Sequence, residues 1–162
     1  MGRGQPRVVG QARPARMIAR GIARRCPRCG SGNLFASWFK LRERCPGCGM
    51  RFEREEGFWL GGYVINFATG EAGIMVLLAV LIGMLANGQH INAALFVGLG
   101  ALIAVLGPVL TFPSSRTTWS AIDLIMRPLA DDERIAAQAA VAAAAVHDDV
   151  LSAPTAPDQA GP

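Results

Sequence analysis

Apolar residues gather into two long runs in the middle of the chain, residues 64–86 and 91–112. The runs hold 23 and 22 residues, and Glu71 is the one charged residue in them. A helix of about 20 apolar residues crosses the ~30 Å hydrocarbon layer of a bilayer. No amphipathic segment elsewhere in the chain could cover both runs as the core of a soluble protein. The pattern therefore predicts two transmembrane helices.

A short polar segment, residues 87–90, separates the two runs, so the helices should form an antiparallel hairpin. Arginine residues crowd before the first run, Arg116 and Arg127 follow the second, and the turn has none. Cytoplasmic segments of membrane proteins carry the excess of Lys and Arg. We therefore expect a multi-pass membrane protein with both termini in the cytoplasm.

Two Cys-Pro-x-Cys-Gly motifs precede the hairpin and supply Cys26, Cys29, Cys45 and Cys48. Two Cys-x2-Cys knuckles at this distance are typical of a zinc ribbon, in which four thiolates surround Zn²⁺ tetrahedrally. The alternatives are a pair of disulfides, a redox dithiol, or iron in place of zinc. A reducing cytoplasm favours metal over disulfides. We expect residues 25–56 to form a small β zinc ribbon, with its strands in the apolar stretch between the knuckles.

The segments on either side of the ribbon and hairpin differ sharply in charge. Residues 1–56 carry thirteen Lys and Arg against four Glu, whereas residues 113–162 carry three Arg against seven acids. The composition predicts a disordered basic arm at 1–24, then the ribbon and a hairpin domain over 57–112. An amphipathic helix lying in the membrane interface is expected at 113–129. An alanine-rich helix and a disordered tail are expected at 130–162.

Two polar residues of the first span, Glu71 and Asn66, form a possible intramembrane site. An ionisable residue within a span is a functional candidate, because burying its charge in hydrocarbon is costly. The alternative is that Glu71 reaches the headgroups or pairs with Arg116. Asn66 can hydrogen-bond across the seam between the two helices.

Residues 25–129 resemble a bacterial family known as domain of unknown function 983. The motifs that carry the resemblance are the two cysteine knuckles, residues 52–61 (FEREEGFWLG) and residues 112–119 (FPSSRTTW). The resemblance implies a protein of the bacterial inner (plasma) membrane, with a cysteine-rich head followed by two hydrophobic spans, and it names no activity. Relatives encoded beside respiratory-oxidase genes imply a part in assembling a membrane complex.

The sequence contains no nucleophile elbow, phosphate loop or paired carboxylates, so we expect a protein that is not an enzyme. The leading interpretation is a docking or assembly factor that contacts the lipid bilayer and other membrane proteins. The basic head motivates an alternative, a membrane-tethered nucleic-acid binder. A thiol- or metal-transfer protein is a further alternative. Nothing in the sequence indicates a small-molecule substrate.

Overall fold

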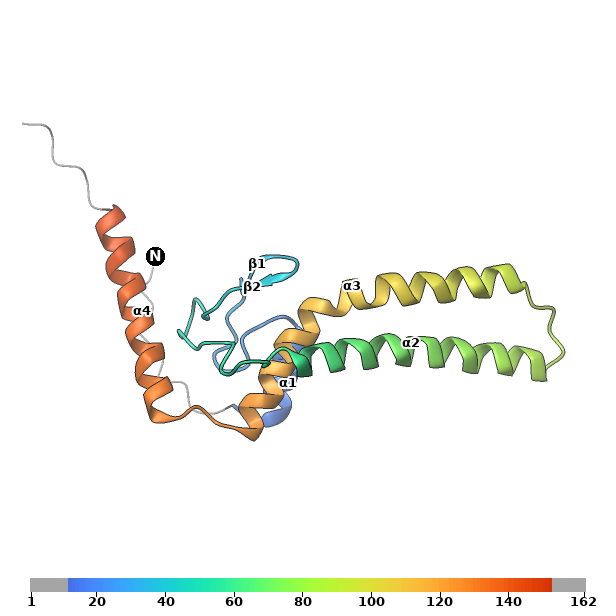
Figure 1. Cartoon of the computed structure of the whole chain (residues 1–162), viewed down its shortest axis with the longest axis horizontal. Coiled ribbons are helices and arrows are strands. Elements are labelled where there is room, and N and C mark those ends of the chain that lie inside the picture. The colour runs from blue at the N-terminus through green and yellow to red at the C-terminus, as the bar shows by residue number, and fades with distance from the viewer. Residues whose placement is uncertain (1–11, 153–162) are drawn as a thin grey trace, which may run out of the picture.

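A computed structural model describes residues 12–152 and contains four helices and one small sheet. A long hairpin of two helices joins a compact head at one end, and a further helix stands beside the head (Figure 1). The elements are α1 Pro14–Ile22, β1 Phe35–Ser37, β2 Lys40–Leu41, α2 Leu60–Ala86, α3 Ala93–Met126 and α4 Asp131–Ser152. Residues 1–11 and 153–162, which fall in the predicted arm and tail, lie outside the described residues.

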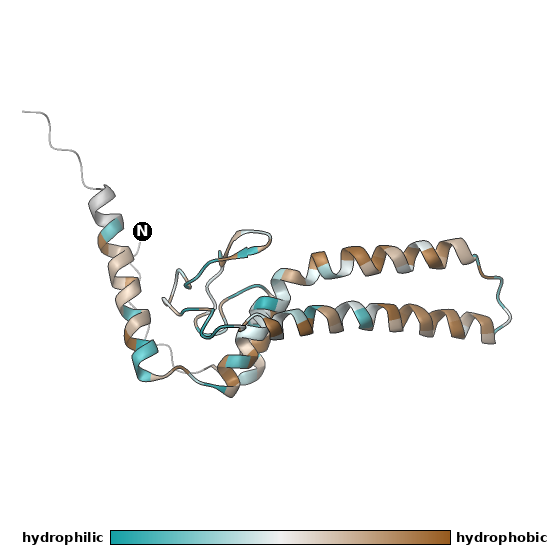
Figure 2. Ribbon diagram, in the orientation of Figure 1, coloured by the Kyte–Doolittle hydropathy of each residue, from teal (hydrophilic) through white to brown (hydrophobic). Residues whose placement is uncertain are grey.

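The hairpin consists of α2 and α3, which run side by side and meet at a turn far from the head (Figure 1). Both helices are long and apolar enough to cross a membrane. Their apolar side chains face outward rather than into a core; Phe67 is 73% exposed and Val97 is 71% exposed. Figure 2 shows this apolar surface along both arms of the hairpin. The two long helices predicted from the apolar runs are therefore present, although both extend past the expected bounds.

The prediction of a separate interfacial helix at 113–129 is wrong, because residues 113–126 are the end of α3. Pro108 and Pro113 lie inside this helix. A proline lacks the backbone N–H and bends a helix rather than always ending it, and α3 turns toward α1 as it enters the head (Figure 1). The bent end is buried within the head; its buried residues are Pro113, Ser115, Thr117, Ser120, Ala121, Asp123 and Leu124.

The prediction of disorder throughout residues 1–24 is also wrong, because this segment contains α1. Pro14 occupies its first turn, where a missing N–H costs no helical hydrogen bond. Met17 is 1% exposed and Gly21 is buried. The helix packs on the bent end of α3 so closely that a Cβ at Gly21 would lie 2.9 Å from the carbonyl oxygen of Thr117. The apolar face of α1 thus decides its structure, despite the arginines around it.

The head is built around both cysteine knuckles, α1 and the end of α3. Strands β1 and β2 pair antiparallel, with Phe35 opposite Leu41, and a single bridge joins Arg44 to Arg51. The buried core is Met17, Cys26, Leu34, Cys45, Met50, Phe52, Ala121, Leu124 and Leu129. Some of these residues precede the hairpin in the sequence and others lie in or after the end of α3. The core of the head therefore forms only when the end of α3 packs against the N-terminal segments.

The close contact between α1 and α3 can be tested by adding one methyl group. Gly21→Ala should lower the midpoint of thermal unfolding in detergent, because overpacking costs about 1–3 kcal/mol. Alanine favours a helix more than glycine does, so a loss of stability would oppose the intrinsic preference. Gly32→Ala is the control, since nothing lies within 4 Å of a Cβ there. Equal midpoints for the two variants would contradict the packing.

Candidate metal centre and its junction with the hairpin

The four cysteines converge on one point of the head. Their Sγ atoms all lie within 4.8 Å of one another. The Sγ atoms of Cys26 and Cys48 are 3.8 Å apart, and those of Cys29 and Cys45 are 3.6 Å apart. All four are free thiols, and these separations are far longer than the ~2.05 Å of a disulfide bond. The four residues predicted as metal ligands are therefore brought together without disulfides.

The spacing of the sulfur atoms fits a tetrahedral metal ion. A metal–sulfur bond of about 2.3 Å, as in zinc sites, gives a tetrahedron whose edges are about 3.8 Å. The pairs at 3.8 and 3.6 Å match that edge closely. Four cysteine ligands also complete the coordination, so such a site leaves no position for water or substrate. The arrangement can hold a metal ion and is suited to a structural role.

The two knuckles share one backbone pattern, which explains how Cys-Pro-x-Cys-Gly folds. In each knuckle the N–H of the first cysteine donates to the carbonyl five residues later, at 2.9 Å. The N–H of the final glycine donates back to the carbonyl of that cysteine, at 2.8 Å. The turn requires a positive φ at this glycine, +82° at Gly30 and +68° at Gly49. Glycine adopts this conformation without the strain that a side chain would cause.

Ser31 makes the surroundings of two sulfur atoms more polar. Its N–H donates to the Sγ of Cys29 at 3.5 Å, and its Oγ lies 3.1 Å from the Sγ of Cys45. Hydrogen bonding, first from the Cys26 thiol and also from Ser31, lowers the pKa of Cys45 to about 6. The thiolate is the form that binds metal, so the contact with Ser31 favours the metal-binding form of Cys45. Sequence analysis did not identify Ser31, since serine after a knuckle is not distinctive.

An arginine of the expected disordered arm supports the first knuckle. Arg20, on α1, donates to the carbonyl oxygens of Pro27 and Arg28, at 3.2 and 3.1 Å. The knuckle's two backbone hydrogen bonds do not use these carbonyls. Helix α1 therefore holds the metal site as well as covering the core.

The second knuckle lies against α4. A Cβ at Gly49 would come 2.0 Å from the carbonyl oxygen of Ala137, which is itself 1% exposed. Only a glycine allows the knuckle and the helix to approach this closely. The alanine-rich face of α4 thus packs directly on the candidate metal centre.

The bend of α3 is stabilised by a side chain from the sheet. Pro113 has no N–H to donate to the carbonyl of Val109, four residues earlier. The indole N–H of Trp38, in the turn between β1 and β2, donates to that carbonyl at 2.8 Å. A hydrogen bond lost to proline within the helix is therefore replaced by one from the head.

Two neighbouring carbonyls of the bend are bound in the same way. The amide of Asn66, on α2, donates to the carbonyl of Pro108 at 2.9 Å. Arg24, just after α1, donates to the carbonyl of Leu110 at 3.3 Å. Together with Trp38, these side chains tie three different segments to consecutive carbonyls of α3. A hydrogen bond of this kind contributes about 0.5–1.5 kcal/mol, so the three together stabilise both the bend and the junction.

A buried carboxylate forms a further part of the junction. Asp123, on α3, is 1% exposed and accepts from Arg54 at 2.9 Å and from Arg127 at 3.1 Å. Arg54 also donates hydrogen bonds to both carboxylate oxygens of Glu133, on α4, at 2.8 and 2.7 Å. The hydrogen bonds from Arg54 lower the pKa of Glu133 below its usual value. This network joins the ribbon, α3 and α4.

The structure separates the two residues predicted as an intramembrane polar site. Asn66 is 7% exposed, and its amide also lies 3.4 Å from the hydroxyl of Ser115. Glu71 is exposed on the outer surface of α2 and has no ion pair among the described residues. Asn66 therefore belongs to the junction, whereas the structure assigns no partner to Glu71.

These features define a class: a two-helix apolar hairpin whose bent second helix carries a head with four convergent cysteines. The chain belongs to the family described as Protein of unknown function (DUF983), whose model matches residues 35–122. The predicted family is thus confirmed over a range that begins after Cys29 and contains only the second knuckle. No curated protein and no solved structure matches the chain.

Asn66 and Glu71 should respond oppositely to substitution. Asn66→Leu removes the donor to the Pro108 carbonyl and should lower the free energy of unfolding by about 1–3 kcal/mol. Glu71→Gln should change it by less than about 0.5 kcal/mol, as is usual for exposed positions. Thermal unfolding in detergent, followed by tryptophan fluorescence, measures both. A larger loss for Glu71→Gln than for Asn66→Leu would contradict this assignment.

Proposed function

We propose that the protein is a membrane-anchored docking or assembly factor, with a structural zinc ion in a cytoplasmic head. The observation that carries the proposal is the direct continuation of an apolar helix, α3, into the core of a four-cysteine head. Such a construction holds a small rigid surface at a defined place beside a hairpin. It suits a protein that positions other proteins better than one that transforms a substrate.

Three features support a membrane location. The hairpin exposes its apolar side chains, and burying that surface in lipid is more favourable than leaving it in water. All helical hydrogen bonds of a span are internal, except at bends, where other donors must substitute. The arginines of the described residues lie at the head end of the hairpin, and the positive-inside tendency supports a cytoplasmic location of both termini in a bacterial cell.

The donor set and its burial support zinc in a structural role. Cys26 is 0% exposed and Cys45 is 2% exposed, so substrates have poor access to these sulfur atoms. Four thiolates close the coordination shell, which disfavours hydrolysis and thiol transfer. Iron bound by four cysteines would have a similar ligand set, so metal analysis must distinguish the two.

The contacts of the basic residues favour docking over nucleic-acid binding. Arg20 and Arg24 donate to backbone carbonyls, and Arg54 binds two carboxylates. These three contribute to the excess positive charge that motivated the alternative, yet they serve the protein's own fold. The partner we propose is another membrane protein, with a respiratory complex suggested by the family resemblance.

Metal content tests the first half of the proposal. The purified protein should contain one zinc ion per chain by elemental mass spectrometry, and Cys45→Ser should lose the metal together with the fold of the head. Ser31→Ala keeps all four thiolates and should retain the metal, but release it faster to a chelator. A folded protein without metal, or with iron, would contradict the zinc assignment.

A deletion strain tests the docking role and the orientation. Native electrophoresis of its membranes should show at least one complex whose subunits accumulate unassembled. Wild-type protein should restore assembly and Cys45→Ser should not, whereas Gly32→Ala serves as the folded control.

A reporter active only outside the cytoplasm, fused after residue 129, should be silent. Normal complexes in the deletion strain would reject the assembly role, and an active reporter would reject the orientation.

A further inference from the structure

Two adjoining pockets lie at the junction of head and hairpin, one polar and one apolar. The polar pocket has a volume of about 260 Å³ and lies between the ribbon and α3. The apolar pocket has a volume of about 420 Å³ and lies on the outer surface of α2 and α3. Phe39, in the turn between β1 and β2, lines both. A molecule with a polar end and an apolar end could therefore occupy the two pockets together.

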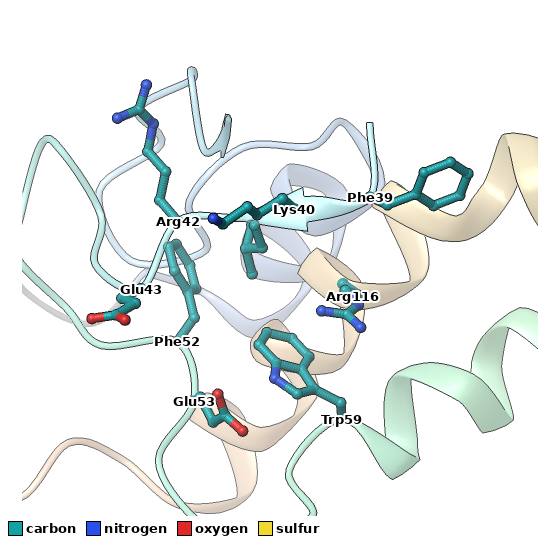
Figure 3. Close-up of a pocket in the computed structure, with 9 residues that line it drawn as sticks. Phe39, Lys40, Arg42, Glu43, Phe52, Glu53, Trp59 and Arg116 are labelled. Atoms are coloured by element: carbon teal, nitrogen blue, oxygen red, sulfur yellow. The ribbon is translucent and has the colours of Figure 1, made fainter. Parts of the chain in front are cut away.

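Arg116 stands at the boundary between them. Its guanidinium carbon lies 4.5 Å from the centre of the Trp59 ring, 4.7 Å from that of Phe112 and 5.8 Å from that of Tyr63. Trp59 lines the polar pocket, whereas Tyr63 and Phe112 line the apolar one. Figure 3 shows the guanidinium beside the Trp59 ring; Lys40 lies on the strand above, with its amino group toward Arg42.

The donors of Arg116 are largely unused. Its hydrogen bond to a side chain is a long one, 3.4 Å to the hydroxyl of Tyr63. Among the described residues it has no carboxylate within 4.0 Å, and neither does Lys40. A guanidinium presents five donors in a planar fork that fits a phosphate group. A cation held over aromatic rings with free donors is therefore ready to bind an anion.

The charges around the polar pocket favour an anion on one side. Its lining contains three basic residues, Lys40, Arg42 and Arg116, and two acidic residues, Glu43 and Glu53. Glu43 lies across the pocket from Arg116 in Figure 3. Arg116 is the basic residue beside the rings that line the apolar pocket, and the lining of the polar pocket as a whole carries one net positive charge, since three of its residues are basic and two are acidic.

The apolar pocket lies where a lipid chain would run. It is lined by Phe39, Tyr63, Asn66, Phe67, Pro108, Val109 and Phe112. The amide of Asn66 is already bound to the Pro108 carbonyl, so this lining offers little polar competition. Aromatic residues at the end of an apolar helix mark the level of lipid headgroups. The polar pocket is therefore at the height of a phosphate and the apolar pocket at the height of its acyl chain.

We propose that the junction is a binding site for one anionic glycerophospholipid, its phosphate on Arg116 and Lys40 and an acyl chain along Phe67 and Phe112. The proposal rests on the membrane location proposed above. It adds a ligand of defined chemistry to the docking role, and it places that ligand between the head and the hairpin.

Native mass spectrometry of the delipidated full-length protein in detergent tests the site. Phosphatidylglycerol and phosphatidylcholine with identical acyl chains are titrated separately, and phosphatidylglycerol should bind at least tenfold more tightly. Glycerol phosphate, which lacks acyl chains, and diacylglycerol, which lacks phosphate, should each bind at least tenfold more weakly than phosphatidylglycerol. Equal binding of the two phospholipids would overturn the proposal. Glycerol phosphate binding as tightly as phosphatidylglycerol would also overturn it, in favour of a soluble phosphate compound.

Variants locate the site. Arg116→Gln should reduce phosphatidylglycerol affinity about tenfold, and Lys40→Gln several-fold. Lys40 is exposed and is not part of the buried core, so its variant remains informative if Arg116→Gln fails to fold. Arg51→Gln, an exposed basic position outside both pockets, is the matched control and should bind as wild type. An equal loss in Arg51→Gln and Lys40→Gln would show non-specific attraction and overturn the site.

A separate measurement keeps this proposal distinct from the proposed function. Resistance of the protein to alkaline extraction from membranes reports on the hairpin alone. A protein that resists extraction but shows no lipid preference retains its membrane anchor and lacks the site. A protein that is extracted lacks the anchor itself.

Discussion

The structure depends on how the backbone carbonyls at the bend of α3 are satisfied. Pro113 removes the hydrogen bond that the carbonyl of Val109 would accept, and the indole of Trp38 supplies another. Without that donor the carbonyl of Val109 would lack its helical partner, and such a hydrogen bond contributes about 0.5–1.5 kcal/mol. The donors come from the sheet, from α2 and from the segment after α1. One bent stretch of helix is therefore joined to three other parts of the chain.

The four-cysteine cluster and the charge network also hold the parts of the head together. The cysteine cluster closes the ribbon locally, and Arg20 and Gly49 attach it to α1 and α4. Asp123 and Arg54 are largely buried, whereas Arg127 is half exposed; the net contribution of the buried pair to stability is small compared with the cost of removing one partner. Its value is directional, since a bidentate arginine fixes the angle between the segments it joins.

The sequence contains strong local signals for the features that were predicted correctly. The apolar runs predict two long helices, and the paired cysteine motifs predict a cluster of four thiols. The errors occurred where long-range contacts override local composition. Arginine-rich residues before Cys26 suggested disorder, although Met17 and Gly21 lie four residues apart and place one buried face on a helix. That spacing, following Pro14, was a signal that could have revealed α1.

The continuity of α3 could not be read in the same way. Pro-Ser-Ser at residues 113–115 is a common helix boundary, and local rules favour ending the second apolar helix before Pro113. The helix continues because Trp38, 75 positions earlier in the chain, replaces the missing donor. The same holds for Gly61, where a Cβ would lie 2.3 Å from the Trp119 ring; the sequence shows a glycine but not the ring that requires it.

The unbroken course of α3 has a mechanical consequence. Its 34 residues correspond to about 50 Å of helix, from the hairpin turn to the core of the head. The head is thus a stiff extension of a long rod and not a domain on a flexible linker. The helix bends between Pro108 and Pro113, and side chains from three other segments donate hydrogen bonds to this bend. The position and tilt of α3 therefore determine where a partner can contact the head. Any tilt of α3 also moves the four sulfur atoms.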